Sequence, residues 1–256
     1  MITKFDSQKE RNFLNSLVDD YKDEAPYSKI KKEIIVTLLK NYWTTPRQKK
    51  GLQMGCSNGY ETTILARQLS RLDVVDGSTL FLEKVKKENE YDNVNFVNAL
   101  FEEYILNGRQ EKYDYVFCHY VLEHVFDVGP VLRNMKANLK PDGYVFCVVP
   151  NRNALSRQLA VKMNLIKDLE GLTENDIRHG HRRTFDANTI SDEFVKYGFE
   201  VLERRGIILK ILADFQLNKM LDEQIITGDL ILALQELGLA HENLCDSIFI
   251  VARPIC

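Results

Sequence analysis

GLQMGCSNGYETTILARQLSRLDVVDG, residues 51–77, holds one complete strand–turn–helix–strand unit. The apolar run Gly51–Met54 predicts a strand, and it leads directly into a glycine-rich turn, Gly55–Gly59. A helical pattern follows near 60–70, and the apolar run Leu72–Asp76 predicts a second strand. A strand, a helix and a strand at this spacing indicate a parallel βαβ unit.

The same alternation continues toward the C-terminus. Further strands are predicted at Val94–Val97, Tyr113–Cys118, Tyr144–Val149, Phe199–Leu209 and Ser247–Arg253. Helical patterns lie near 7–43, 78–89, 100–107, 128–139, part of 153–180, Asp186–Tyr197, 212–222 and 228–238. Because crossovers between parallel strands are right-handed, the helices must cover both faces of the sheet. The sequence therefore predicts an α/β fold with a Rossmann-like, doubly wound sheet.

Composition and charge exclude several classes of protein. The 256 residues are 45% hydrophobic and 28% charged, which argues against a disordered chain, a collagen-like repeat or a coiled-coil rod. The net charge of −3 gives no strongly basic footprint for nucleic acid. No apolar run approaches the roughly 18–20 residues that cross a bilayer, and the charged start Met1–Arg11 does not resemble a secretory signal. We therefore expect a cytoplasmic protein that acts without nucleic acid or membrane.

The cysteines indicate neither a disulfide scaffold nor a zinc site. They are odd in number, widely spaced and form no CxxC pair. Cys118 and Cys147 lie in apolar runs and are predicted to be core thiols. The other three are Cys56, Cys245 and Cys256.

The glycine turn and a later acid together indicate a nucleotide-like ligand. Such a turn lets the backbone approach a ligand closely and points helix N–H groups at it. Asp76 ends the next predicted strand, where an acid accepts hydrogen bonds from ribose hydroxyls in Rossmann-like sheets. These two features alone do not separate a dinucleotide from S-adenosylmethionine. The letters Gly55-x-Ser57-x-Gly59 lack the third glycine of the dinucleotide pattern.

Three motifs carry a family resemblance. They are LQMGCSNG at 52–59, YDYVFCHYVLEHV at 113–125 and LKPDGYVFCVVPN at 139–151. Together they resemble class I S-adenosylmethionine-dependent methyltransferases, in the branch that includes the ubiquinone-biosynthesis O-methyltransferases. The resemblance covers roughly 48–151, with weaker similarity to about 205 and at SIFIVAR, 247–253. It implies a seven-stranded sheet in which SIFIVAR is an antiparallel strand beside the sixth.

The order of the predicted elements indicates a division of the chain, and the resemblance adds what each part would do. The chain is expected to form a single methyltransferase domain, 1–256, with a helical N-terminal lid at 1–46 and a cofactor-binding core at 47–151. The acceptor side, 152–256, then carries C-terminal-side insertions, including a helical one at 211–240. The apolar stripe Ile211, Leu212, Phe215 and Leu217 there is interpreted as core packing, with a homodimer face or a pocket roof as alternatives.

By position, the resemblance assigns residues to S-adenosylmethionine and its product, S-adenosylhomocysteine. The methionine part would lie against Gly55, Cys56, Ser57 and Gly59, the ribose against Asp76, Gly77 and Ser78, and the adenine against Ala99, Leu100 and Phe101. His119 and Tyr120 would lie beside the sulfonium. The chain departs from the motif at two positions: Gln53 replaces the usual acid, and Ser57 replaces the middle glycine. A glutamine can still accept a hydrogen bond from the cofactor amino group.

Methyl transfer needs alignment of the two reactants, and a hydroxyl or ammonium acceptor also needs a base. His119, Tyr120 and His124 lie close together after the fourth predicted strand. Phosphoethanolamine methyltransferases have an acid and a catalytic histidine at the four-residue spacing of Tyr120 and His124. The alternative is packing for His124 and cofactor contact without proton transfer for His119.

The segment His179-Gly180-His181-Arg182-Arg183 is a second candidate cluster. Its cations could neutralise a phosphate or carboxylate on the acceptor, with His181 as a base, or the segment is a solvated turn. No metal is predicted, because no further His or Cys lies nearby in the sequence. Tyr27, Asn151 and Arg152 are further candidates for acceptor contact.

These observations predict transfer of a methyl group to an oxygen or nitrogen of a small polar metabolite. The basic cluster favours an anionic or phosphorylated acceptor, and the resemblance favours a sugar-like or related metabolite, in bacterial surface-polysaccharide or secondary metabolism. A nucleic-acid methyltransferase and a non-catalytic, cofactor-binding partner subunit are the alternatives.

Overall fold

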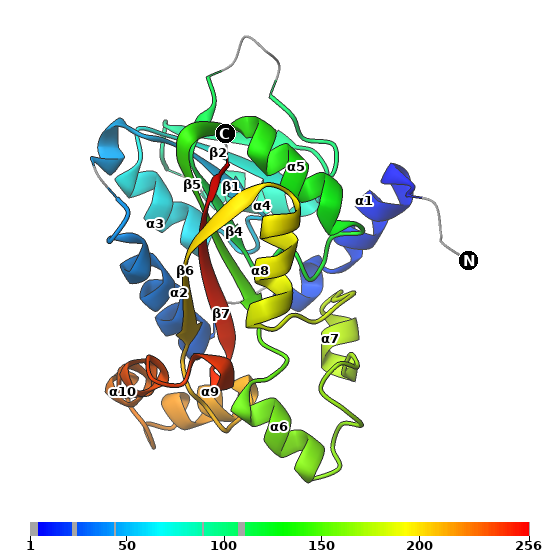
Figure 1. Ribbon diagram of the computed structural model, residues 1–256, viewed down its shortest axis with the longest axis vertical. Coiled ribbons are helices and arrows are strands. Elements are labelled where there is room, and N and C mark those ends of the chain that lie inside the picture. The colour runs from blue at the N-terminus through cyan, green and yellow to red at the C-terminus, as the bar shows by residue number, and fades with distance from the viewer. Residues whose placement is uncertain (1–4, 22–24, 44, 89, 107–110, 256) are drawn as a thin grey trace.

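The computed structural model describes residues 5–21, 25–43, 45–88, 90–106 and 111–255. Their centre is a seven-stranded sheet in the order β3-β2-β1-β4-β5-β7-β6 (Figure 1). The strands β1 to β5 pair in parallel, and β7 lies antiparallel between β5 and β6. This confirms the Rossmann-like prediction and the antiparallel position of SIFIVAR.

The strand bounds follow the apolar runs closely. They are β1 Lys50–Met54, β2 Arg71–Asp76, β3 Val94–Asn98, β4 Tyr113–His119, β5 Leu139–Pro150, β6 Phe199–Ile207 and β7 Ser247–Pro254. The main difference is β5, which begins at Leu139 rather than at Tyr144, because Leu139 already pairs with Tyr113 of β4. Most residues of β1, β2, β4 and β7 are buried, as expected for strands covered on both faces.

Each face of the sheet packs against its own layer of helices. On one face, α5 (Val128–Asn138) and α8 (Ala187–Lys196) bury Leu132, Ile190 and Phe194 against the sheet. On the other, α2 (Pro26–Leu39), α3 (Tyr60–Gln68) and α4 (Thr79–Glu88) bury residues such as Ile35 and Leu65. These two apolar layers stabilise the sheet, and the sheet in turn fixes the positions of the turns that follow its parallel strands.

The N-terminal region is helical but not continuous. It forms α1 (Ser7–Ser16), a short 3₁₀ helix at Val18–Tyr21 and then α2, so the predicted run at 7–43 is divided, and 22–24 lie outside the described residues. Asp6 caps α1 by accepting hydrogen bonds from the backbone of Gln8 and Lys9. Helix α1 lies beside the end of β2, where a Cβ atom on Gly77 would be 2.4 Å from Leu14.

The helix predicted near 100–107 is wrong. The described residues 101–106 form a turn and a coil, and 107 lies outside the described residues. The side-chain amide of Asn134 on α5 donates to the backbone carbonyls of Phe101 and Glu102, at 3.0 and 2.8 Å. These bonds engage the two carbonyls with α5, whereas in a helix the same carbonyls would accept hydrogen bonds from backbone N–H groups of that helix.

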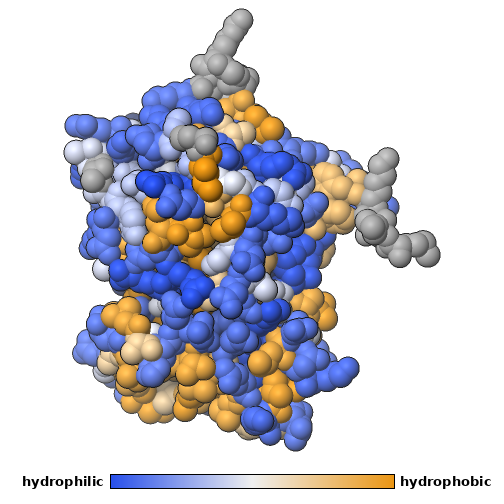
Figure 2. Space-filling model, in the orientation of Figure 1, coloured by the Kyte–Doolittle hydropathy of each residue, from blue (hydrophilic) through white to orange (hydrophobic). Residues whose placement is uncertain are grey.

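The C-terminal half adds helices beyond the end of the sheet. They are α6 (Leu155–Lys162), α7 (Glu174–Arg178), α9 (Asp214–Asp222) and α10 (Gly228–Gly238). Of the predicted apolar stripe at 211–217, Leu217 is buried, whereas Ile211 and Phe215 are 56% and 73% exposed. Core packing therefore accounts for only part of the stripe, and apolar side chains are visible at this end of the molecule (Figure 2).

Two sequence expectations concern cysteines and membrane spans. Cys56, Cys118, Cys147 and Cys245 are buried free thiols, and Cys256 lies outside the described residues. Among the helices of the described residues, none combines the length and the apolarity that a membrane crossing needs.

Candidate active site

The glycine-rich turn joins β1 to α3 with three residues in the left-handed region. Gly55, Ser57 and Gly59 have φ values of 79°, 46° and 82°. Ser57 thus adopts a left-handed conformation that glycine takes easily and that strains a residue with a side chain. The turn keeps the backbone shape expected for close approach to a ligand.

Asp76 lies at the end of β2 with its carboxylate directed at this turn. It accepts hydrogen bonds from the backbone N–H of Cys56 at 3.1 Å and of Ser78 at 2.8 Å. Burial raises the pKa of Asp76, and these two hydrogen bonds oppose the shift. One buried acid therefore links the turn after β1 to the turn after β2.

The residues assigned to the adenine and ribose lie together beside Asp76. Ala99 donates its N–H to the Asp76 carbonyl at 3.2 Å, Leu100 is buried, and a Cβ atom on Gly77 would be 2.7 Å from Leu100. Phe101 packs on the neighbouring core. Helix α1 covers this region, because the Ser78 hydroxyl bonds to Asn15 at 2.7 Å.

At the methionine end, the structure adds Glu61, which the sequence reasoning missed. The Gln53 side-chain carbonyl accepts a hydrogen bond from the Thr62 hydroxyl at 2.8 Å, and both residues are buried. His119, the last residue of β4, places Nδ1 2.5 Å from a carboxylate oxygen of Glu61 on α3. The His119 Nε2 atom is buried and has no hydrogen-bond partner among the described residues.

Glu61 is ionised despite its position. Burial favours the neutral form, but the charge and hydrogen bond of His119, with a contribution from Lys32, lower the pKa of Glu61 below its usual value. A buried carboxylate beside an unpaired ring nitrogen is an arrangement found where ligands bind. The available signal was the position of Glu61 directly after the glycine turn.

Tyr120 follows His119 in a strained backbone conformation, with a φ of 55°. Its hydroxyl donates to the Ser247 hydroxyl at 2.9 Å, and burial raises its pKa to about 12. Tyr120 is therefore a neutral hydrogen-bonding group near pH 7. The Lys31 ammonium lies 4.8 Å from the centre of its ring.

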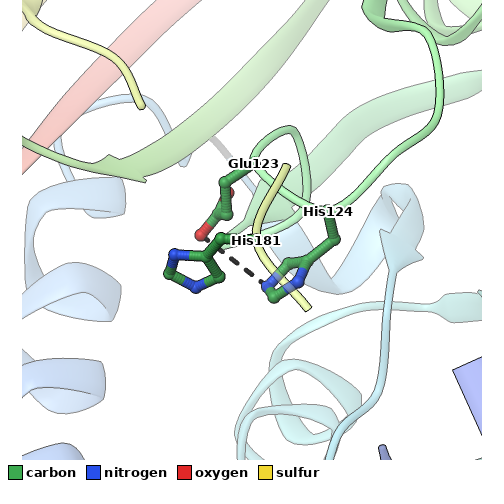
Figure 3. Close-up of side chains that lie close together, drawn as sticks. All are labelled: Glu123, His124 and His181. Carbon is green, nitrogen blue, oxygen red and sulfur yellow. Dashed lines mark ion pairs between the residues drawn. The ribbon is translucent and has the colours of Figure 1, made fainter. Parts of the chain in front are cut away.

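Glu123, His124 and His181 converge at one point (Figure 3). Their nearest nitrogen and oxygen atoms lie within 4.8 Å of one another, and the two rings are 4.7 Å apart. Neither carboxylate oxygen of Glu123 finds a hydrogen-bond partner in the described part of the chain. The predicted pair of Tyr120 and His124 is thus supplemented by a cluster, and His181 does have a second histidine beside it in space.

Burial sets the charges in this cluster. It raises the pKa of Glu123 to about 7, while burial and the nearby His181 lower the pKa of His124 to about 3. His181 places Nδ1 3.3 Å from Asp176, whose carboxylate also pairs with Arg157 at 3.1 Å. A carboxylate that orients an imidazole in this way fixes which ring nitrogen faces the cluster.

The two arginines predicted to bind the acceptor are used inside the fold. Arg182 pairs with Glu10 of α1 at 2.9 Å, and its guanidinium lies 4.8 Å from the Phe13 ring and 5.6 Å from the Phe126 ring. Arg183 donates to the backbone carbonyls of Leu122, Val125 and Phe126. These contacts argue against the acceptor role, because one terminal nitrogen of Arg182 and both terminal nitrogens of Arg183 already donate within the fold. The Nε atom of Arg182 is buried and has no partner among the described residues.

Three more predicted contacts have structural partners. Asn151 is buried and donates to the carbonyls of Asn243 and Cys245 at 3.0 and 2.8 Å. Arg152 pairs with Asp186, the N-cap of α8. His179 is half-buried, and its Nδ1 lies 2.8 Å from the Asn175 carbonyl. The contacts of Asn151 and Arg152 do not direct them toward the Glu123 cluster, whereas the Tyr21 ring contacts both His179 and His124, at 5.6 and 6.5 Å.

Tyr27 instead belongs to a second polar cluster, on the other side of Tyr120. Its hydroxyl donates to Asp246 at 3.4 Å, and Asp246 also pairs with Lys31 at 3.3 Å and Lys210 at 2.9 Å. Asp214, which is half exposed at the start of α9, pairs with the same two ammonium groups. Apart from Tyr27, the sequence reasoning missed this cluster, whose members lie far apart in the chain.

The residues present fit the cofactor that the resemblance implies. The turn has a left-handed backbone without bulky side chains, Asp76 is a buried acid at the ribose position, and His119 Nε2 is a buried polar atom without a partner among the described residues at the methionine end. All three lie at the carboxyl edge of the sheet, where open α/β sheets bind ligands.

Comparison with known proteins gives a family. A family model described as a methyltransferase domain matches residues 27–204, which is more than half of the chain. A curated relative, the ubiquinone biosynthesis O-methyltransferase of Actinobacillus pleuropneumoniae serotype 5b (strain L20), is 30% identical over 118 residues. That alignment covers 44% of this chain and 50% of the relative, so the chain spans about half the length of such relatives.

Solved structures share the fold across most of the chain. The N-methyltransferase NodS of Bradyrhizobium japonicum WM9, in complex with S-adenosylhomocysteine, has a TM-score of 0.61 at 13% identity and covers 95% of this chain and 98% of its own. The Haemonchus contortus phosphoethanolamine N-methyltransferase 2, with phosphomonomethylethanolamine and S-adenosylhomocysteine, has a TM-score of 0.61 at 15% identity. This match covers 88% of this chain and 53% of the other.

Proposed function

Because this chain belongs to the class I S-adenosylmethionine-dependent methyltransferases, we propose that it methylates an oxygen or nitrogen of a small, anionic, polar metabolite. The cofactor is S-adenosylmethionine and the product S-adenosylhomocysteine. The observation that carries the proposal is the Glu123, His124 and His181 cluster. It supplies proton acceptors a few residues beyond the end of β4, the strand end that also carries His119 and Tyr120, which are predicted to lie beside the sulfonium.

When bound, the cofactor supplies an activated methyl group and a good leaving group. The chain must align the acceptor, exclude water and take up the acceptor proton. In our proposal, the acceptor heteroatom forms its bond to the methyl carbon as the bond from carbon to sulfur breaks. The proton then passes to His181, which Asp176 orients at 3.3 Å. Neutral His124 and Tyr120 hold the acceptor by hydrogen bonds.

The anionic class of the acceptor rests on Lys31 and Lys210 rather than on the arginines. Both ammonium groups lie close to the Tyr27 ring, and Lys31 also lies close to the Tyr120 ring. Asp246, whose side chain is 15% exposed, pairs with both, and Asp214, whose side chain is 49% exposed, is the more easily displaced partner. We infer that a phosphate or carboxylate of the acceptor replaces Asp214 between the two lysines.

The first test is methyl transfer from radiolabelled S-adenosylmethionine to matched acceptors, hydroxyl or amine, each with and without a phosphate or carboxylate. Asp214→Asn should lower the Michaelis constant of the anionic member several-fold, and Lys210→Gln should raise it about ten-fold or more. Lys219→Gln is the matched control, because Lys219 is on the same helix and 73% exposed. Equal constants for all three variants would refute the lysine site.

The second test addresses the base. His181→Gln should lower turnover at least ten-fold at neutral pH while leaving the affinity for S-adenosylhomocysteine unchanged. His241→Gln is the control, because His241 is exposed and does not belong to the cluster. A His181→Gln enzyme with full turnover would leave proton removal to His124 or Glu123.

A further inference from the structure

Resting on the proposed function, we propose that Glu61 binds the α-ammonium group of the cofactor's methionine part. This carboxylate on α3 would take over the role of the acid that the motif lacks at Gln53. The proposal concerns a residue outside the motif positions. It follows from three features of the methionine end of the cradle.

The first feature is that Gln53 is not available. Its side-chain carbonyl accepts the Thr62 hydroxyl hydrogen at 2.8 Å, and Gln53 and Thr62 are 3% and 1% exposed. The remaining side-chain group of a glutamine is an amide NH₂, which donates and repels an ammonium. The motif position therefore contributes no acceptor with a free negative charge.

The second feature is the position of Glu61. It is two residues beyond Gly59, in the first turn of α3, and its side chain reaches His119 at the end of β4. Strands β1 and β4 are parallel neighbours, with Gln53 opposite Phe117. His119 and the turn at Gly55 therefore lie at the same edge of the sheet, and Glu61 lies between them.

The third feature is the charge that Glu61 keeps. The charge and hydrogen bond of His119, with a contribution from Lys32, outweigh the effect of burial on the pKa of Glu61, so its carboxylate stays ionised. A carboxylate accepts several hydrogen bonds, and an ammonium group has three hydrogens to donate. The His119 Nε2 atom beside it is buried without a partner among the described residues, and a buried polar atom of this kind is costly unless a ligand supplies a partner.

The test compares two ligands that differ only in the amino-acid part. S-adenosylhomocysteine carries the α-ammonium group, and 5′-methylthioadenosine lacks the whole amino-acid end. Calorimetry should show that Glu61→Gln weakens binding of S-adenosylhomocysteine about ten- to hundred-fold, the loss expected for a charge-assisted hydrogen bond, while the affinity for 5′-methylthioadenosine stays within two-fold. Glu83→Gln, on the exposed face of α4, is the control and should change neither affinity.

A measurement on the unaltered chain covers the case in which Glu61→Gln does not fold. The S-adenosylhomocysteine analogue with a hydroxyl in place of the α-amino group should bind at least ten-fold more weakly than the parent ligand. Equal binding of these two ligands, or an equal loss for both ligands in Glu61→Gln, would overturn the proposal. Failure of the unaltered chain to bind either nucleoside would instead contradict the methyltransferase function itself.

Discussion

Arg182 and Glu10 are 172 residues apart in sequence, and the Arg182 guanidinium donates to both carboxylate oxygens of Glu10, at 3.0 and 2.9 Å. The pair joins the segment after α7 to the N-terminal helix α1. The same helix places Leu14 and Asn15 beside Gly77 and Ser78. A contact on the acceptor side of the site therefore holds the element that covers the ribose position.

We expect Arg182→Gln to loosen α1. The change removes the cation from Glu10, which is 7% exposed, and the loss of this charge-assisted hydrogen bond costs about 1.5–3 kcal/mol. Hydrogen exchange should accelerate in α1, and the affinity for S-adenosylhomocysteine should fall several-fold. Arg178→Gln is the control, because the Arg178 side chain is 66% exposed. Unchanged exchange in α1 would show that the pair does not hold the helix.

Arg183→Ala should act on stability rather than on the acceptor. It leaves the carbonyls of Leu122, Val125 and Phe126 without their guanidinium donors. Loss of such charge-assisted bonds costs about 2–4 kcal/mol in the free energy of unfolding, which urea denaturation measures. The Michaelis constant for the acceptor should stay the same at a temperature where the variant is folded. A selective rise in that constant without loss of stability would restore the acceptor role predicted from the sequence.

Prediction from the sequence succeeded where the structure depends on residues that are close together in the chain. The strands were predictable because each is a continuous apolar run, and the turn Gly55–Gly59 because its glycines are adjacent. The early start of β5 was missed, because its pairing with Tyr113 depends on a neighbour distant in the chain. Lys31, Lys210 and Asp246 were missed for the same reason: the fold alone brings them together. The placement of β7 came from the resemblance.

Asp76→Ala should weaken binding of S-adenosylhomocysteine by about 1.5–3 kcal/mol, the value of charge-assisted hydrogen bonds. The structure adds a second cause, since Asp76 also holds the backbone of Cys56 and Ser78. Calorimetry measures the affinity, with Asp92→Ala at an exposed position as the control. NAD should not bind either protein. An unchanged affinity in Asp76→Ala would remove this residue from the site.

We predict that methyl transfer needs no metal, because the leaving group requires no Lewis acid. The cluster of Glu123, His124 and His181 could contradict this prediction by holding a metal ion, since all three side chains offer ligand atoms. Activity should be the same before and after dialysis against EDTA. Activity that is lost in EDTA and restored by magnesium or zinc would assign the cluster to a metal instead.

The last prediction uses the pKa of Glu123, which burial raises from 4.5 to about 7. The folded chain then binds a proton at Glu123 more tightly than the unfolded chain does. This contribution to stability is fully present below pH 4.5 and is lost as the pH rises through 7. Glu123→Gln removes this titration and leaves the other groups in place. The stability of the unaltered chain relative to the variant should therefore increase as the pH falls from 7 to 4.5, by on the order of 3 kcal/mol.

The titration of His124 opposes that of Glu123 in the pH dependence of the free energy of unfolding. The pKa of His124 is lowered from 6.5 to about 3, so the unfolded chain gains a proton there between these values and acid destabilises the fold. In the unaltered chain the contributions of these two neighbours should nearly cancel between pH 4.5 and 6.5. In Glu123→Gln the His124 contribution is no longer opposed by Glu123, so the profile of the variant should be steeper than that of the unaltered chain by about 1.4 kcal/mol per pH unit. Urea denaturation of both proteins across this range measures the difference, and parallel profiles would show that Glu123 is ionised in the folded chain.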